Sequence, residues 1–232
     1  MIASLFFFPP PKPMVTPVTL TDPFDTIWYH GTHAKPFSTW KCPPPPPSPA
    51  DVGHTGLFFT ADQGYAKHAG TNICTIKLSP ETKLIVPARG GNDSSALRQA
   101  VTRCNSIATY CQWLISDAVW TDAWATGQVT RFSFDTSNHK HVYEIGLAVA
   151  RVAANLKKMI KTPVPEQLLM NQALMCLTRG WIEQLVLEAR KLGYQAIQGA
   201  EIDRWSAPNA TPVAQSWLAV MDASVITAPA WL

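Results

Sequence analysis

The stretch that decides the expected fold is Trp28-Tyr29-His30-Gly31-Thr32, and a second stretch, Gly56-Leu57-Phe58-Phe59-Thr60, follows it along the chain. Each is a short run of strand-forming residues that ends in glycine or threonine, as expected for a strand that leads into a turn. Residues Ala61 to Ala69, after the second stretch, have helical character, and the segment Thr60-Ala61-Asp62-Gln63 resembles a helix N-cap. Two strand ends of this kind predict a pocket for a nucleotide, because glycine permits a close backbone approach.

Length and composition favour a single globular domain. The chain of 232 residues is long enough to enclose a sizeable core, which favours one elaborated domain over two small ones. The net charge of +3 is small and the basic residues are scattered, which argues against a nucleic-acid-binding face. The apolar run Ile2 to Phe8 stops at Pro9 and lacks a basic flank, so we expect neither a signal peptide nor a membrane span.

No metal centre is expected from the cysteines and histidines. The cysteines are odd in number and include no C-x-x-C pair, which favours reduced thiols in a cytoplasmic protein. His139-Lys140-His141 is interpreted as a polar turn before a helix. A serine hydrolase is also disfavoured, because the chain has no Gly-x-Ser-x-Gly motif. The five cysteines are Cys42, Cys74, Cys104, Cys111 and Cys176.

The order of the predicted elements indicates an α+β domain. Residues 1–25 are predicted to be a proline-rich arm and residues 26–232 the domain itself. Within the domain, Pro43 to Pro47 form either a rigid surface connector or a docking site for a partner that recognises proline. A helical insertion is expected at about residues 93–192. Strands are expected at Ile27–Tyr29, Gly56–Thr60, Ile73–Leu78, Lys83–Pro87, Tyr194–Ile197 and Trp217–Met221.

The helical insertion is divided by its apolar periodicity. One helix is expected from Asp93 to about Ile115, and a second from Val142 to Met159, ended by Pro163. A third is expected from Pro165 to Leu177 and a fourth from Trp181 to Leu192, with Gly193 just after its end.

The two opening stretches, in this order and spacing, resemble the first two sequence blocks of ADP-ribosyltransferases of the diphtheria-toxin-like, H-Y-E lineage. This lineage includes the poly-ADP-ribose polymerases and the rifamycin-modifying transferases. The segments Leu192 to Ile197 and Trp217 to Asp222 resemble the closing strands of the family. The resemblance covers about half of the chain and implies a split β-sandwich core, with the helical block as an insertion.

The resemblance implies that NAD is the substrate. By this likeness His30 would bond to a ribose hydroxyl of NAD, and the Gly31 backbone would hold the nicotinamide carboxamide. Thr32 would support the turn through its hydroxyl, and Phe58 could stack on nicotinamide, with Tyr65 as a second stacking face or as a packing residue. The NAD-binding residues implied are Tyr29, His30, Gly31, Thr32, Phe58, Thr60 and Tyr65.

The chain departs from the family in its last strand. Trp217 stands where the family usually carries a glutamate, and Gln215 lies two residues earlier on the same face of an extended strand. Gln215 could orient the substrate or, if a bulge shifts the register, supply the catalytic polar group. Glu201, expected in the preceding loop, is an alternative. The candidate catalytic residues are therefore Gln215, His30 and Glu201.

The expected function is transfer of ADP-ribose from NAD to a macromolecular acceptor, either protein or nucleic acid, as by a cytoplasmic enzyme or a toxin-like effector delivered into another cell. Arg204 and Trp205, in the loop before the last strand, would read this acceptor together with Trp217. The alternatives are an NAD glycohydrolase, a catalytically silent module that binds NAD or ADP-ribose, and an interaction protein. No metal and no membrane partner are expected.

Overall fold

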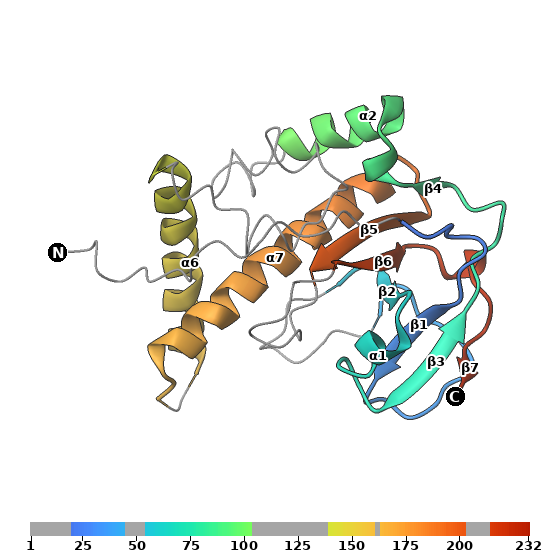
Figure 1. The fold of residues 1–232 in the computed structure, drawn as a ribbon, viewed down its shortest axis with the longest axis horizontal. Coiled ribbons are helices and arrows are strands. Elements are labelled where there is room, and N and C mark those ends of the chain that lie inside the picture. Colours follow the sequence, from blue (N-terminus) through green and yellow to red (C-terminus); the bar gives the residue numbers. More distant parts are fainter. Residues whose placement is uncertain (1–19, 45–53, 104–138, 161–162, 203–213) are drawn as a thin grey trace.

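The computed structural model describes residues 20–44, 54–103, 139–160, 163–202 and 214–232, which form an α+β fold around a mixed sheet (Figure 1). The α+β class predicted from the sequence is therefore confirmed. The strands are β1 (Trp28–Thr32), β2 (Leu57–Thr60), β3 (Asn72–Ile76), β4 (Leu84–Ile85), β5 (Ala196–Ile202), β6 (Ala214–Val220) and β7 (Ala230–Trp231). The helices are α1 (Gln63–Ala66), α2 (Gly91–Thr102), α6 (His139–Met159) and α7 (Glu166–Lys191), with 3-10 turns at Pro87–Arg89 and Ala223–Val225.

The sheet consists of two well-paired halves with a weak joint between them. Its strand order is β4-β5-β6-β2-β1-β3-β7, and among the described strands only β4 and β5 pair in parallel. The β5–β6 ladder contains seven residue pairs and the β1–β3 ladder contains five. In contrast, β1 and β2 meet at the single pair Tyr29–Thr60. The sheet is thus split between β2 and β1.

One hydrophobic cluster fills the space between the helices and the sheet half that contains β5 and β6. Trp217 and Ala219 of β6 project into this cluster, together with Ile197 of β5. The helices contribute Leu97 and Val101 from α2, Ala148 from α6, and Ile182, Leu185, Val186 and Ala189 from α7. Burial of these apolar side chains holds α7 against the sheet (Figure 1).

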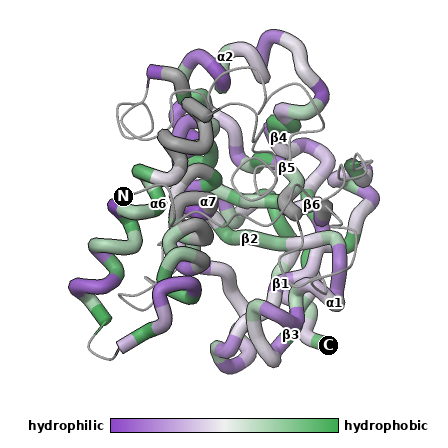
Figure 2. Tube along the Cα trace, turned by 60° about the vertical axis from the view of Figure 1, so that its left-hand side comes forward, coloured by the Kyte–Doolittle hydropathy of each residue, from purple (hydrophilic) through white to green (hydrophobic). Residues whose placement is uncertain are grey.

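The opposite face of the sheet carries the second cluster. Leu218 and Val220 of β6 project into it, so the side chains of β6 alternate between the two clusters. Because β6 is buried on both faces, it is apolar almost throughout, as Figure 2 shows for the central strands. The other members of this cluster include Trp28, Trp40, Leu57, Phe59, Cys74 and Ile76.

The short helix α1 packs directly on β1 at Gly31. Asp62 caps α1, because its Oδ1 accepts a hydrogen bond of 2.7 Å from the Tyr65 N–H. A Cβ atom at Gly31 would collide with the backbone carbonyl of Ala66, at the end of α1. The close approach of α1 to β1 therefore requires a glycine at position 31.

The strand predictions are confirmed in position, but several boundaries were wrong. β1 continues through His30, Gly31 and Thr32, so these residues lie within a strand and not after its end. α1 ends at Ala66, short of the predicted Ala69. β5 extends to Ile202, and Glu201 therefore belongs to a strand, whereas the sequence predicted a loop. Pairing with β6 along the whole length of β5 explains this extension, since a partner strand satisfies its backbone groups.

The predicted third and fourth helices are one helix. α7 is continuous from Glu166 to Lys191 and passes through Gly180. A glycine inside a helix costs about 1 kcal/mol relative to alanine, and the packing of Ala173, Ile182 and Leu185 outweighs this cost. The end at Gly193 is confirmed, because this residue has φ of 81° after the C-cap Leu192.

The other two helices of the insertion are described in part. α6 begins at His139, so His139, Lys140 and His141 belong to its first turn and not to a preceding turn. α2 begins at Gly91, and the predicted continuation of this helix beyond Arg103 lies outside the described residues, as do most of the N-terminal arm and of the proline run.

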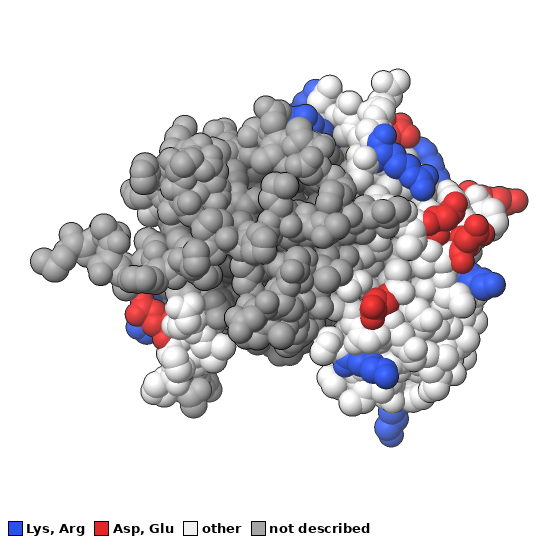
Figure 3. Space-filling view, in the orientation of Figure 1, with Lys and Arg blue, Asp and Glu red and all other residues white. Residues whose placement is uncertain are grey.

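Charged side chains of both signs are interspersed on the described part of the face in Figure 3. Among the helices of the described ranges, none combines the length and the apolar sequence needed to cross a membrane.

Gly31→Ala is expected to lower the free energy of unfolding by about 1 to 3 kcal/mol, because the added methyl group meets rigid backbone and must push α1 away from β1. Gly180→Ala is the matched control. A Cβ at Gly180 meets nothing within 4 Å, and alanine should stabilise α7 by about 1 kcal/mol. Urea unfolding of the two variants measures both effects, and a Gly31→Ala protein as stable as the wild type would contradict the packing of α1 described above.

Candidate ligand-binding site

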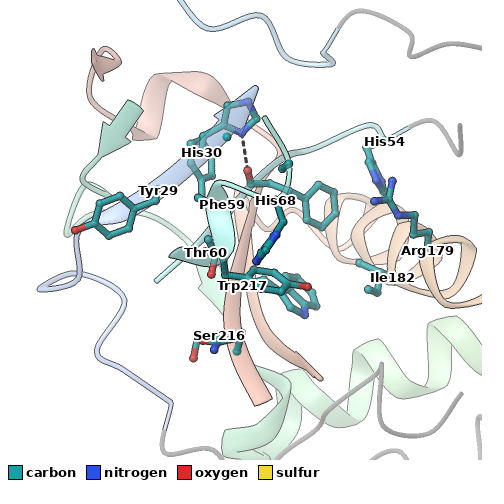
Figure 4. A pocket seen from close by; sticks show the side chains of 16 residues that line it. Tyr29, His30, His54, Phe59, Thr60, His68, Arg179, Ile182, Ser216 and Trp217 are labelled. Carbon is teal, nitrogen blue, oxygen red and sulfur yellow. Dashed lines mark hydrogen bonds between the residues drawn. The ribbon is translucent and has the colours of Figure 1, made fainter. Parts of the chain in front are cut away.

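A cavity of about 450 Å³ lies at the split in the sheet. This volume lies within the range of roughly 300–1,000 Å³ that is typical of small-molecule sites. Figure 4 shows the cavity, to which β1, β2, β6, α1 and α7 all contribute. Its lining residues are Tyr29, His30, Gly31, His54, Phe58, Phe59, Thr60, Tyr65, Ala66, His68, Ala69, Arg179, Ile182, Gln215, Ser216 and Trp217.

His30 is fixed beside the cavity by a hydrogen bond across the split. Its Nδ1 lies 2.8 Å from the carbonyl oxygen of Phe58 on β2 (Figure 4). A carbonyl only accepts hydrogen bonds, so Nδ1 carries the proton and Nε2 is the nitrogen left for a ligand. Trp40 packs edge-on against the imidazole at 5.4 Å between ring centroids, and Phe59 packs at 5.6 Å. These contacts set the orientation of the ring.

Burial keeps the His30 imidazole in its neutral form. Desolvation lowers the pKa of His30 below its ordinary value of 6.5, and this effect outweighs the hydrogen bond to Phe58, which acts in the opposite direction. In the neutral form with a proton on Nδ1, Nε2 presents a lone pair. Nε2 is therefore a hydrogen-bond acceptor in this form of His30.

The β1 edge next to His30 is open at Gly31. Extension of the β1–β2 register by two residues beyond Tyr29–Thr60 would set Gly31 opposite Phe58, but the Phe58 carbonyl accepts the His30 ring N–H instead. Within the described residues, Tyr29–Thr60 remains the one pair that joins these two strands. Backbone at Gly31 therefore lines the cavity. Thr32 lies outside the lining and holds the following turn, since its Oγ1 accepts a 3.1 Å hydrogen bond from the Ala34 N–H.

Trp217 is part of the cavity wall and of the core at once. Its side chain is 5% exposed and its indole lies over Gly199 on the neighbouring strand, where a Cβ atom would collide with the ring. Phe58 packs between Trp217, at 5.9 Å, and His54, at 4.5 Å between ring centroids. Trp217 thus fills the position at which the family resemblance implies a glutamate.

Gln215 lines the cavity, and β6 contains no bulge near it. The pairs from Ala196–Val220 to Ile202–Ala214 follow one uninterrupted register, and β6 pairs equally regularly with β2. The alternative in which a bulge shifts Gln215 into the glutamate position is therefore wrong. Glu201 is the register partner of Gln215, on the adjacent strand β5.

The remaining predicted residues fall into two groups. Thr60 and Tyr65 line the cavity, and the Thr60 hydroxyl also accepts a 3.2 Å hydrogen bond from the Asp62 N–H before α1. Arg204 and Trp205 lie outside the described residues. The cavity thus brings together Tyr29, His30, Gly31, Phe58, Thr60, Tyr65, Gln215 and Trp217.

The sequence analysis did not assign eight of the lining residues to the site, namely His54, Phe59, Ala66, His68, Ala69, Arg179, Ile182 and Ser216. Arg179 and Ile182 lie on α7, more than a hundred positions after β2, and helical periodicity does not indicate which sheet edge a helix crosses. The signal available for His54 was its place two residues before Gly56. The described lining contains one arginine and three histidines but no aspartate or glutamate.

No group of three or more potential metal ligands gathers in the part of the chain that the structure describes. Comparisons of the chain with protein-family models, with curated proteins and with solved structures found no match.

The pKa of His30 predicts how stability depends on pH. Since the pKa is lower in the folded than in the unfolded chain, the unfolded chain takes up the proton first as the pH falls through about 6.5, and the free energy of unfolding decreases below that pH. His30→Gln should flatten this dependence between pH 7 and 5. NMR titration of the His30 ring measures the pH midpoint of its protonation. The His30 signal is assigned by its absence from the spectrum of the variant. A midpoint at or above 6.5 would refute the buried neutral state.

Trp217→Ala is expected to lower the free energy of unfolding by about 3 to 5 kcal/mol, because it opens a cavity above β5. Gly199→Ala should cost about 1 to 3 kcal/mol in the wild type, since the added methyl group meets the indole. In the Trp217→Ala background that cost should largely disappear. Chemical unfolding of the four proteins completes the cycle, and a Gly199→Ala cost that is equal in both backgrounds would rule out the contact.

Proposed function

We propose that the protein binds NAD in this cavity, cleaves the bond between nicotinamide and ribose, and transfers ADP-ribose to a macromolecular acceptor. One observation carries the proposal. Three of the four segments that resemble the transferase family lie far apart in the sequence, yet β1, β2 and β6 bring these three together around one cavity. The split between β2 and β1 supports the finer proposal that the core is a split β-sandwich of the ADP-ribosyltransferase type.

Each cavity residue has a role in the proposed binding of NAD. The nicotinamide carboxamide needs both a donor and an acceptor, which the open backbone edge at Gly31 offers. Nε2 of the neutral His30 would accept a hydrogen bond from a ribose hydroxyl. Phe58 and Tyr65 supply aromatic surface for the nicotinamide ring.

The proposed reaction breaks the C1′–N bond, and the electron pair leaves with neutral nicotinamide. The ribose then carries an oxocarbenium-like charge at C1′, and the acceptor attacks there as it loses a proton. Gln215, in the cavity wall, can orient the ribose or the acceptor through its amide. Glu201, the register partner of Gln215, is our candidate for the carboxylate that stabilises the developing positive charge.

The described cysteines agree with a reducing compartment, and we therefore propose action in the cytoplasm, whether of the producing cell or, for an effector, of another cell. Cys42 and Cys74 carry free thiols.

A second candidate function is a silent module that holds NAD or ADP-ribose without cleavage. The burial of Trp217 against Gly199 favours it, because the indole occupies the glutamate position of the resembling family. An NAD glycohydrolase is the third candidate and differs from the transferase in using water as the acceptor.

Incubation of the purified protein with NAD separates these functions. The transferase releases nicotinamide and adds the mass of ADP-ribose to a protein or nucleic acid of a cell extract, whereas the glycohydrolase releases free ADP-ribose. His30→Ala should reduce nicotinamide release at least about tenfold, because the proposed hydrogen bond from a ribose hydroxyl to Nε2 is lost. Glu201→Gln should reduce release more strongly than Gln215→Ala if Glu201 is the catalytic carboxylate.

His33→Ala is the matched control for His30→Ala, since His33 is exposed and lies outside the cavity lining. It should release nicotinamide at the wild-type rate. Calorimetric binding of NAD without any release of nicotinamide would identify the silent module. Absence of NAD binding would refute the proposed function altogether.

A further inference from the structure

Different kinds of side chain line the two sides of the cavity. In Figure 4, Tyr29 lies on one side of it, whereas His54 and Arg179 lie on the opposite side. The first side belongs to β1 and the second to α7 and the segment before β2. Arg179 places a positive charge on the α7 side of the cavity, and no aspartate or glutamate is present among the described lining residues.

His54 is held in place by α7. Its Nδ1 lies 3.4 Å from Oε2 of Glu183, and its ring packs on Phe58. The other carboxylate oxygen, Oε1, accepts hydrogen bonds from the N–H and the hydroxyl of Thr55, at 3.0 and 2.6 Å. Glu183 is thereby engaged behind the imidazole. Nδ1 faces this carboxylate, so Nε2 is the ring nitrogen left for a ligand, and it donates an N–H to an anion in the imidazolium form, in which both nitrogens carry protons.

Arg179 and His54 are linked through the same helical turn. Glu183, which holds His54, follows Arg179 by four residues on α7, so the two positions lie one above the other on the helix. The helix that carries the cation therefore also orients the imidazole. Two nitrogen-bearing side chains from separate segments are positioned on one side of the cavity.

We propose that Arg179 and His54 form an anion subsite that binds the diphosphate of a dinucleotide. A guanidinium matches phosphate oxygens through two parallel N–H bonds, and such charge-assisted bonds strengthen away from water. The inference rests on the proposed function for the identity of the dinucleotide as NAD. It gives α7, part of the helical insertion, a direct role in the binding of the ligand, with the nicotinamide end towards β1.

Calorimetric titration with four probes tests the subsite. The probes are ADP-ribose and inorganic pyrophosphate, which carry the diphosphate, and adenosine and nicotinamide, which lack it. Arg179→Gln should weaken the binding of ADP-ribose and pyrophosphate at least about tenfold, and Arg179→Lys less, because lysine keeps the charge but not the planar fork. His54→Gln should weaken the same two ligands. The binding of adenosine and nicotinamide should stay unchanged in all three variants.

Lys191→Gln is the matched control. It removes one positive charge from the same helix, at a side chain that is 67% exposed and pairs with Glu188 at 2.7 Å. It should bind all four probes as the wild type does. Wild-type affinity for ADP-ribose should also fall as salt is raised, whereas affinity for adenosine should not. This comparison of salt dependence needs no variant. It therefore tests the binding of the diphosphate by charge even if circular dichroism shows that Arg179→Gln does not fold.

Two results would overturn the subsite. One is ADP-ribose binding by a folded Arg179→Gln protein with wild-type affinity, and the other is a wild-type protein that binds ADP-ribose no better than adenosine. Failure of the proposed function can be distinguished from failure of the subsite. If NAD binds with dependence on Arg179 but is not cleaved, the subsite stands and the catalytic proposal falls. If Arg179→Gln binds and cleaves NAD like the wild type, the catalytic proposal stands and the subsite falls.

Discussion

The hydrogen bond from His30 Nδ1 to the Phe58 carbonyl is the contact on which the site depends. It lies beside the one backbone pair that joins β1 to β2, and it engages the carbonyl that a continued ladder would use. A side chain thus joins the two halves of the sheet while their backbones separate. The separation opens the Gly31 edge to the cavity, and the same bond fixes the tautomer of His30.

The packing of α1 and of α7 closes the cavity on two sides. α1 approaches β1 at Gly31 so closely that no other residue fits, and α7 is held by the apolar cluster that it shares with β5 and β6. Glu183 extends this hold to the segment before β2 through Thr55 and His54. The helix α7 is therefore a structural wall of the cavity, which the sequence analysis did not anticipate.

Trp217 shows how packing limits the chemistry of the site. Its indole covers Gly199 and borders Phe58, and the glycine and the tryptophan are register partners on β5 and β6. Gly199 leaves room for the large indole of Trp217 on the neighbouring strand. A glutamate at position 217 would not require a glycine at this place. In the proposed reaction the carboxylate would come from another position, for which Glu201, paired with Gln215 in the uninterrupted register, is our candidate.

By itself, the sequence determined the local elements and the first part of the site. Period-two apolar runs, the turn formers and the glycine at 193 predicted the strands and the end of α7, because these signals act within a few residues. The tertiary structure alone decided that Gly180 does not end a helix, that Glu201 is in a strand, and that Arg179 and His54 border the cavity. Those features depend on contacts between segments distant in the chain, whose burial energy outweighs local preference.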